Sequence, residues 1–205
     1  MGFDKLTADL LGKPVLLYSV EAFLQCPEVD HIILVTSEDR FDLIANAVSG
    51  RNIIRVDGGK TRQSSVEAGI RSLPDEATLV AIHDGARPLI RPADISKCLA
   101  AAKQYGAATL ARSVTETLKR ADLEGFTRTP IDRNDLYFME TPQCFRANIL
   151  RRAYNHVKER RMTVTDEVSA IESIGVNSKI IETSAPNIKI THPGDIRIVA
   201  ALMTS

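Results

Sequence analysis

Residues 78–88 read Thr-Leu-Val-Ala-Ile-His-Asp-Gly-Ala-Arg-Pro, and this stretch indicates the fold more clearly than any other. Its first half is a short apolar run with β-branched members, which is typical of a buried strand. Its second half, from His83 to Pro88, is polar, small and turn-forming. Open parallel sheets bind ligands at the carboxyl ends of their strands. A strand that runs directly into such residues therefore predicts both an α/β fold and a binding loop.

The segments around this strand alternate between strand and helix patterns. Apolar runs predict further strands at residues 31–36 and 53–56. Helical spacing predicts helices at 14–24, 39–48, 62–73 and 92–105, the last of them ended by Gly106. Strands that alternate with helices predict an α/β protein with a mostly parallel sheet flanked by helices.

The alternation breaks between Ala107 and Tyr137. Residues 109–118 predict a long strand, 122–125 a turn and 126–131 a returning strand, a pattern that fits a protruding β-arm. Helices at 146–159 and 166–174, a strand at 179–182 and a last helix from Pro193 to near Leu202 then follow. Without repeats or linkers, residues 1–205 are expected to form a single domain, with the arm at about 112–137.

Composition argues against several classes of protein. The formal net charge is zero, so a nucleic-acid partner held by a basic surface is not expected. No apolar run reaches the roughly 20 residues of a membrane-spanning helix, and the first residues do not resemble a signal peptide. The three cysteines are scattered, so neither a disulfide framework nor a zinc site is expected. We predict a cytoplasmic protein.

Polar clusters follow two of the predicted strands. In residues 57–65, two glycines allow close backbone approach, and the next helix offers free N–H groups to an anion. A plain glycine turn before a polar helical turn explains the same residues slightly better. In the second cluster, Asp84 can hold a divalent cation or a hydroxyl group, and Arg87 can pair with it or bind phosphate. A capping aspartate beside a structural arginine is an equally weighted alternative.

A third set of polar residues is spread over the second half of the chain. Thr165 precedes Asp166 and Glu167 at a predicted helix start, where a cap with two acidic neighbours is a sufficient explanation. Lys189 lies between two isoleucines, where a solvated lysine is the simpler interpretation. The absence of G-x-S-x-G, P-loop and G-x-G-x-x-G motifs argues against serine hydrolases, P-loop nucleotidases and dinucleotide-binding proteins.

Six segments become specific when they are taken together. They are V-D-G-G-K-T-R-Q-S-S-V (56–66), I-H-D-G-A-R-P (82–88), V-T-E-T-L-K-R (114–120), D-R-N-D-L-Y-F-M-E-T-P-Q-C-F (132–145), T-D-E-V-S-A-I-E-S-I-G (165–175) and N-I-K-I-T-H-P-G-D-I (187–196). In this order and spacing they resemble the 2-C-methyl-D-erythritol 4-phosphate cytidylyltransferase family over essentially the whole chain. The resemblance implies a Rossmann-like nucleotidyltransferase fold and a homodimer into which the β-arm crosses.

The resemblance also implies an activity. The chain would transfer a cytidylyl group from cytidine triphosphate (CTP) to 2-C-methyl-D-erythritol 4-phosphate (MEP), releasing pyrophosphate, with Mg²⁺ as cofactor, in non-mevalonate isoprenoid biosynthesis. The attacking phosphate oxygen is already anionic, so cations that position the substrates matter more than a general base. The implied residues are Gly59, Lys60, Ser65 and Gly85 for CTP, Asp84 for the metal and ribose region, Lys5 for charge on the α-phosphate, and Lys189, Thr117, Thr165 and the partner's Arg133 for MEP, with Lys5, Arg133 and Lys189 as the catalytic set.

The resemblance is incomplete at the N-terminus. The family begins with an apolar strand and a Gly-rich loop of the form A-A-G-x-G-x-R-M-G, and only its end matches Met1-Gly2. We expect a truncated or miscalled start rather than a shortened paralogue, with unpaired edges on the flanking strands and impaired activity of the 205-residue chain. Two alternatives remain open: a ribitol-5-phosphate cytidylyltransferase and a noncatalytic nucleotide-binding paralogue.

Overall fold

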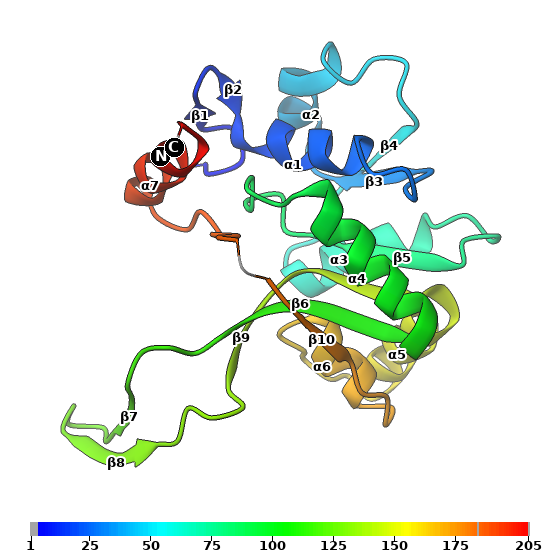
Figure 1. Ribbon diagram of the computed structural model, residues 1–205. Coiled ribbons are helices and arrows are strands. Elements are labelled where there is room, and N and C mark those ends of the chain that lie inside the picture. Colours follow the sequence, from blue (N-terminus) through cyan, green and yellow to red (C-terminus); the bar gives the residue numbers. More distant parts are fainter. Residues whose placement is uncertain (1–3, 184, 205) are drawn as a thin grey trace.

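The computed structural model describes residues 4–183 and 185–204, and it confirms the α/β class (Figure 1). The body of the protein contains a four-stranded sheet and a separate two-stranded pair. Their strands are β3 (Ile32–Val35), β4 (Ile53–Val56), β5 (Leu79–Ile82), β6 (Ala107–Ser113), β9 (Tyr137–Arg146) and β10 (Lys179–Glu182). The main sheet has the order β10-β6-β9-β5, and β3 pairs in parallel with β4. Because β9 is antiparallel to both β5 and β6, it alone runs against the direction of the other three strands.

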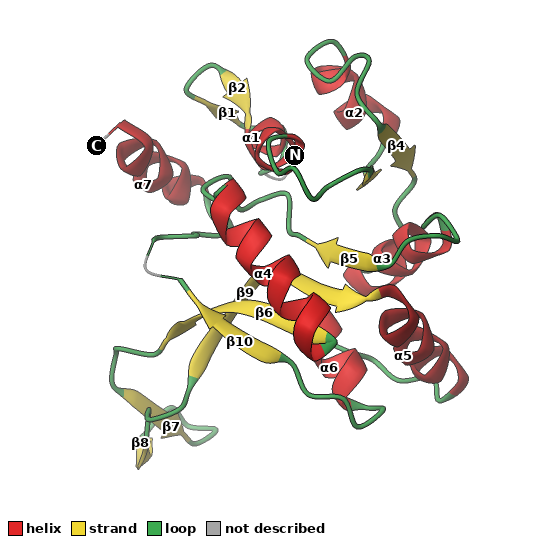
Figure 2. Cartoon of the chain, turned by 45° about the vertical axis from the view of Figure 1, so that its right-hand side comes forward, coloured by secondary structure: helices red, strands yellow, loops and turns green. Residues whose placement is uncertain are grey.

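Helices cover both faces of the main sheet. They are α1 (Val15–Leu24), α2 (Glu38–Ala45), α3 (Arg62–Arg71), α4 (Pro92–Tyr105), α5 (Ala147–Glu159), α6 (Glu167–Glu172) and α7 (Pro193–Thr204). Cys144 packs in a core with α4, which lies across one face of the sheet (Figure 2), and with residues at the end of α1, whereas the next residue, Phe145, packs with α5 and α6. Successive strand residues point to opposite faces, so the sheet separates two apolar cores.

The sequence did not predict strand β9. Pro142 lies within it, and proline lacks the N–H group that a central strand needs. The structure accommodates this residue at an irregularity, because pairing with β6 shifts register between Thr109 and Ala111. Pairing with β5 ends where Ile82 lies opposite Gln143, so Pro142 is beyond that ladder.

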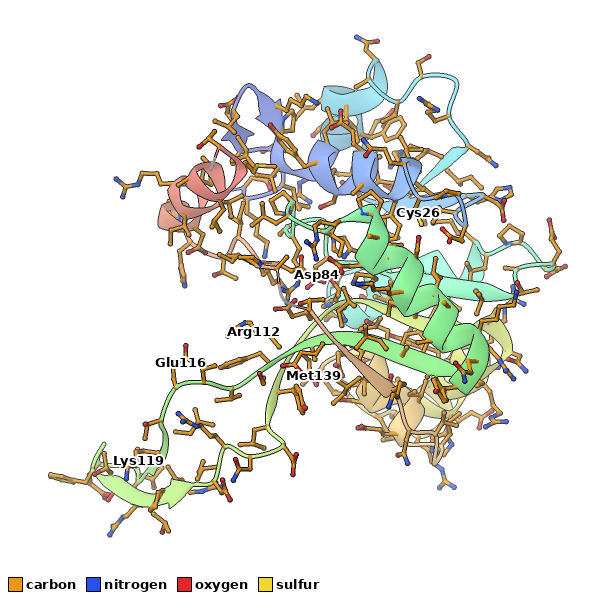
Figure 3. The ribbon with its side chains drawn as sticks, viewed as in Figure 1. Cys26, Asp84, Arg112, Glu116, Lys119 and Met139 are labelled. Atoms are coloured by element: carbon orange, nitrogen blue, oxygen red, sulfur yellow. The ribbon has the colours of Figure 1, made fainter. Side chains whose placement is uncertain are left out.

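A β-arm projects from the main sheet, as the sequence predicted (Figure 1). Its end is the antiparallel hairpin of β7 (Leu118–Ala121) and β8 (Thr127–Ile131), so the predicted strand over 109–118 is interrupted after Ser113. Figure 3 shows Asp84 in the body of the protein and Lys119 far out on the arm. Leu123 and Phe126 at the hairpin turn are largely exposed.

The N-terminal region packs against the C-terminal helix. The short hairpin of β1 (Asp9–Leu10) and β2 (Lys13–Pro14) joins α7 in a small core built around Leu10 and Val199. In the described chain, β3 pairs with β4 alone and β5 with β9 alone, so each strand keeps one edge without a strand partner. No helix within residues 4–183 and 185–204 is long and apolar enough to cross a membrane.

Candidate active site

Asp84 follows β5, and strand β9 fixes its position. The backbone N–H of Asp84 donates to Oγ1 of Thr141, at 3.0 Å. The Thr141 hydroxyl lies 3.0 Å from Nδ1 of His83, whose Nε2 lies 3.3 Å from the carbonyl oxygen of Arg87. These contacts suit a neutral imidazole that accepts at Nδ1 and donates at Nε2. Burial lowers the pKa of His83 to about 4, which also favours the neutral form.

Three cations surround the carboxylate of Asp84. Nζ of Lys189 lies 2.7 Å from Oδ2, Nε of Arg62 lies 3.3 Å from Oδ1, and Nε of Arg87 lies 3.9 Å from Oδ2. Burial alone would raise the pKa of Asp84, but these cations, led by Lys189, lower it to about 2. Asp84 is therefore ionised at neutral pH. Lys189 is held in this cluster, so its interpretation as a freely solvated side chain is wrong.

A second carboxylate balances one of these cations. The guanidinium of Arg62 donates to both oxygens of Glu167, at 2.7 and 2.8 Å, and Glu167 is fully buried. Burial lowers the pKa of Arg62, but Glu167 and Asp84 outweigh this effect and raise it. No role for Arg62 or for this ion pair was predicted from the sequence. The available signal was that both residues lie in conspicuous polar segments, 57–65 and 165–167.

Arg87 ties the C-terminal segment to the loop after β5. Its guanidinium donates to the carbonyl oxygen of Asn187 at 2.7 Å, and the N–H of Ile190 donates to the carbonyl oxygen of Ala86 at 2.8 Å. Residues 187–190 form no strand. Their extended backbone is instead held by these two contacts, which bring Lys189 to Asp84.

The glycine-containing loop after β4 is locked by its own hydroxyl groups. Ser65 Oγ accepts from the N–H of Gly59 at 3.1 Å, and Thr61 forms a reciprocal cap with Ser64 at the start of α3. A Cβ on Gly59 would lie 2.2 Å from Ser64 Oγ, so only glycine fits there. Lys60 is exposed at the same turn. The turn-and-cap interpretation is thus correct, and the resulting loop presents Gly59 and Lys60 at the carboxyl end of β4.

Gly85 has a packing role. A Cβ at this position would lie 2.7 Å from Cδ1 of Leu16, and Leu6 lies on the same side. The carbonyl oxygen of Leu6 accepts from the N–H of Leu16 at 3.0 Å. Lys5 is therefore adjacent in sequence to Leu6, which packs against the Asp84–Gly85 turn.

Thr165 is exposed, and it does not cap α6. Asp166 is the cap, because its side chain accepts from the N–H of Ser169 at 2.9 Å. The carboxylate of Asp166 also accepts from Nε2 of Gln143 at 2.9 Å. Thr165 is therefore adjacent in sequence to a network that β9 and α6 share.

The structure does not bring Arg133 and Thr117 into the Asp84 cluster of the same chain. Both residues are exposed on the arm, and the guanidinium of Arg133 donates to the carbonyl oxygen of Thr115. The arm leads away from Asp84, as Figure 3 shows through the positions of Arg112, Glu116 and Lys119. Asp84, Gly85 and Lys189 gather around one loop, whereas Arg133 and Thr117 do not.

The acidic residues suit a metal only in part. Among the described residues, no group of three or more His, Cys, Asp or Glu side chains is placed to hold an ion. Mg²⁺ is commonly bound by one or two carboxylates together with substrate phosphates and water. Asp84 offers one carboxylate at this loop, which fits a magnesium site in which the substrate supplies most of the ligands.

Fold and site together define an α/β protein of the nucleotidyltransferase type. The chain belongs to the 2-C-methyl-D-erythritol 4-phosphate cytidylyltransferase family, whose pattern it matches over residues 1–205. A relative of that name from Dehalococcoides mccartyi is 39% identical over 206 residues, covering 98% of this chain and 89% of the relative. The chloroplastic relative from Oryza sativa is 37% identical, covering 95% of this chain and 66% of the plant protein.

Solved structures agree with this assignment. The 4-diphosphocytidyl-2C-methyl-D-erythritol synthase of Anaerococcus prevotii has a TM-score of 0.89 at 27% identity, covering 98% of this chain and 93% of that one. The cytidylyltransferase of Thermus thermophilus has a TM-score of 0.84 at 25% identity, covering 98% and 94%. The chain is thus a nucleotidyltransferase, and the ribitol-5-phosphate alternative is not favoured.

Proposed function

We propose that this chain transfers a cytidylyl group from CTP to MEP and releases pyrophosphate, in the non-mevalonate biosynthesis of isoprenoid precursors. The observation that carries the proposal is the cluster of Lys189, Arg62 and Arg87 around Asp84, in a chain of this family. Three cations face one carboxylate there, and Glu167 balances only one of them. The ion pairs at Asp84 and Glu167 join three cations to two carboxylates, and cations gathered in this way suit polyanionic substrates.

The chemistry requires two polyanions to approach each other. The nucleophile is a phosphate oxygen of MEP, which is anionic at neutral pH, so no residue has to remove a proton from it. Lys189 uses one N–H for Asp84 and can direct its other N–H groups at the MEP phosphate. Lys5, beside the Asp84–Gly85 turn, would face the α-phosphate and stabilise the charge that develops there. The loop at Gly59, Lys60 and Ser65 would hold the cytidine part.

The proposal includes Mg²⁺. Asp84 would be its protein ligand, with substrate phosphates and water as the others. When bound, the ion neutralises phosphate charge and favours departure of pyrophosphate. This chain's own contribution is to hold the Asp84 carboxylate ionised and oriented by Lys189 and Arg62.

The proposal also includes a homodimer in a reducing, cytoplasmic compartment. Exposed Leu123 and Phe126 on the arm favour a second copy as the partner, since large apolar side chains at a hairpin turn are otherwise unfavourable. In such a dimer, the arm would bring Arg133 and Thr117 to the MEP phosphate of the other subunit. Three free, buried cysteines agree with a reducing compartment.

The direct test is pyrophosphate release by the purified chain with CTP, Mg²⁺ and either MEP or ribitol 5-phosphate. We expect release that requires MEP and is much slower with ribitol 5-phosphate. Equal rates with the two polyol phosphates would favour the rival substrate. Tight CTP binding without release would favour a noncatalytic nucleotide-binding protein.

A further inference from the structure

Glu167 is a fully buried carboxylate at the start of α6, and hydrogen bonds fix both its side chain and its backbone. Arg62 binds both of its oxygens, and the hydroxyl of Tyr154 donates to Oε1 at 3.0 Å. Its backbone N–H donates to Oε1 of Gln143 at 3.1 Å. Because the side chain has no exposed surface, Glu167 does not itself touch a ligand.

Arg62 connects Glu167 to the candidate active site, because it contacts both Glu167 and Asp84. Its two terminal nitrogens are occupied by Glu167, and its Nε points at Oδ1 of Asp84, at 3.3 Å. The guanidinium is planar, so fixing its terminal nitrogens also fixes the direction of Nε. Arg62 is thereby held toward Asp84.

We propose that Glu167 is a positioning residue: it locks Arg62, which then occupies one oxygen of Asp84 and leaves the other to Lys189. The inference rests on the proposed function for its kinetic consequence. When Arg62 fixes Oδ1 of Asp84, Oδ2 is fixed as well, and so is the position of the Lys189 ammonium group that it binds. Misplacement of a reacting group by about 1 Å lowers rates by about 100-fold.

A purely structural ion pair is the rival explanation. Buried ion pairs are weak sources of stability, and well-packed apolar residues often replace them without loss of the fold. The two explanations therefore differ in the effect of replacing Glu167 on kcat of the folded protein. A structural Glu167 can be replaced without a change in kcat, whereas a positioning Glu167 lowers kcat when it is replaced, and only while Arg62 is present.

The first experiment compares Glu167→Gln with Glu172→Gln, an exposed residue of the same helix. Thermal unfolding first establishes the temperature at which every variant is folded, and initial rates with CTP, MEP and Mg²⁺ are then measured below it. We expect kcat of Glu167→Gln to fall by about 10- to 100-fold, with KM changed by less than about 3-fold. Glu172→Gln should match the wild type. An unchanged kcat for Glu167→Gln would overturn the proposal.

The second experiment removes both partners in Arg62→Met/Glu167→Met, which leaves no buried charge unpaired. A folded double variant with the same low kcat as Arg62→Met alone supports positioning through Arg62, whereas wild-type kcat in the double variant, or a kcat below that of Arg62→Met, overturns it. A crystal structure of Glu167→Gln decides the matter independently of activity. Loss of the Arg62–Asp84 contact supports the proposal, whereas Arg62, Asp84 and Lys189 in unchanged places contradict it. A wild-type chain that releases no pyrophosphate refutes the proposed function, and this structural result still stands.

Discussion

Lys189 and Asp84 are 105 residues apart in the sequence, yet Nζ of Lys189 lies 2.7 Å from Oδ2 of Asp84. The contact forms because Arg87 and Ala86 bind the backbone of residues 187–190 and hold it beside the loop after β5. It joins the segment that carries Lys189 to the loop after β5 that carries Asp84. The proposed role of Lys189 depends on this geometry.

Replacement of Lys189 by alanine should abolish most of the activity and preserve the fold. Asp84 keeps Arg62 and Arg87 as partners, so no buried charge is left alone. We expect kcat/KM with CTP and MEP to fall by about 100- to 1000-fold, because a charge that stabilises the transition state is lost. Circular dichroism should be unchanged, and Lys97→Ala, an exposed lysine on α4, should keep full activity. Unaltered steady-state kinetics for Lys189→Ala would remove this residue from the site.

Gly85→Ala should destabilise the protein through packing. The added Cβ would meet Leu16 at 2.7 Å, and over-packing of this kind typically costs about 1–3 kcal/mol. The matched control is Gly194→Ala, whose added Cβ meets nothing within 4 Å. Denaturant unfolding of the two variants measures the difference. A Gly85→Ala variant as stable as the wild type would show that Leu16 moves aside freely.

The stability of the protein should fall as the pH drops from about 6.5 to about 4, and His83 should cause part of that fall. Burial holds the pKa of His83 at about 4 in the folded protein, below its ordinary value of 6.5. The unfolded chain therefore takes up the proton first, so the contribution of His83 is present above pH 6.5 and is lost as the pH falls through 4. We expect the loss to amount to about 1–3 kcal/mol.

Urea unfolding of the wild type and His83→Gln at several pH values in this range isolates that effect. Burial raises the pKa of Glu140, which acts in the opposite direction in the wild type and the variant alike, so the difference between them reports His83. His31→Gln, an exposed histidine, serves as the control and should follow the wild-type profile. Parallel profiles for the wild type and His83→Gln would contradict a neutral, buried His83.

Much of the fold follows from local patterns in the sequence, and the exceptions have physical causes. The strand before His83 and the helix that ends at Gly106 were predicted because apolar spacing and a glycine stop are local signals. Strand β9 was missed because Pro142 argues against a central strand, and the register shift that accommodates it depends on β6. Periodicity alone cannot reveal such a tertiary compensation.

The candidate site likewise contains residues that the sequence predicts and contacts that only the structure reveals. Asp84 and the loop at Gly59 follow strands, so their position at the end of a sheet was predictable. The partners of Asp84 come from three distant segments, and single-sequence spacing does not encode the approach of Arg62 or Lys189. Lys189 was singled out through family resemblance alone. Glu167 was read as a favourable charge at a helix start, and its burial against Arg62 appears only in the structure.

The arm should mediate dimerisation through its exposed apolar side chains. Phe126→Ser should shift the protein toward monomer in analytical ultracentrifugation and lower its activity, because Arg133 would no longer reach a second subunit. Leu43→Ser is the matched control, since Leu43 is also exposed but lies on α2, away from the arm. A Phe126→Ser protein that sediments like the wild type would argue against this part of the arm as the interface.

Mixing two inactive variants tests most directly whether Lys189 of one subunit and Arg133 of another serve the same reaction. Lys189→Ala and Arg133→Ala are purified separately, mixed, allowed to exchange subunits, and assayed for pyrophosphate release with CTP, MEP and Mg²⁺. In a randomly mixed dimer population, about a quarter of the sites contain both native side chains, so about a quarter of wild-type activity should return. No recovery despite confirmed subunit exchange would contradict a shared site, as would full activity of either variant alone.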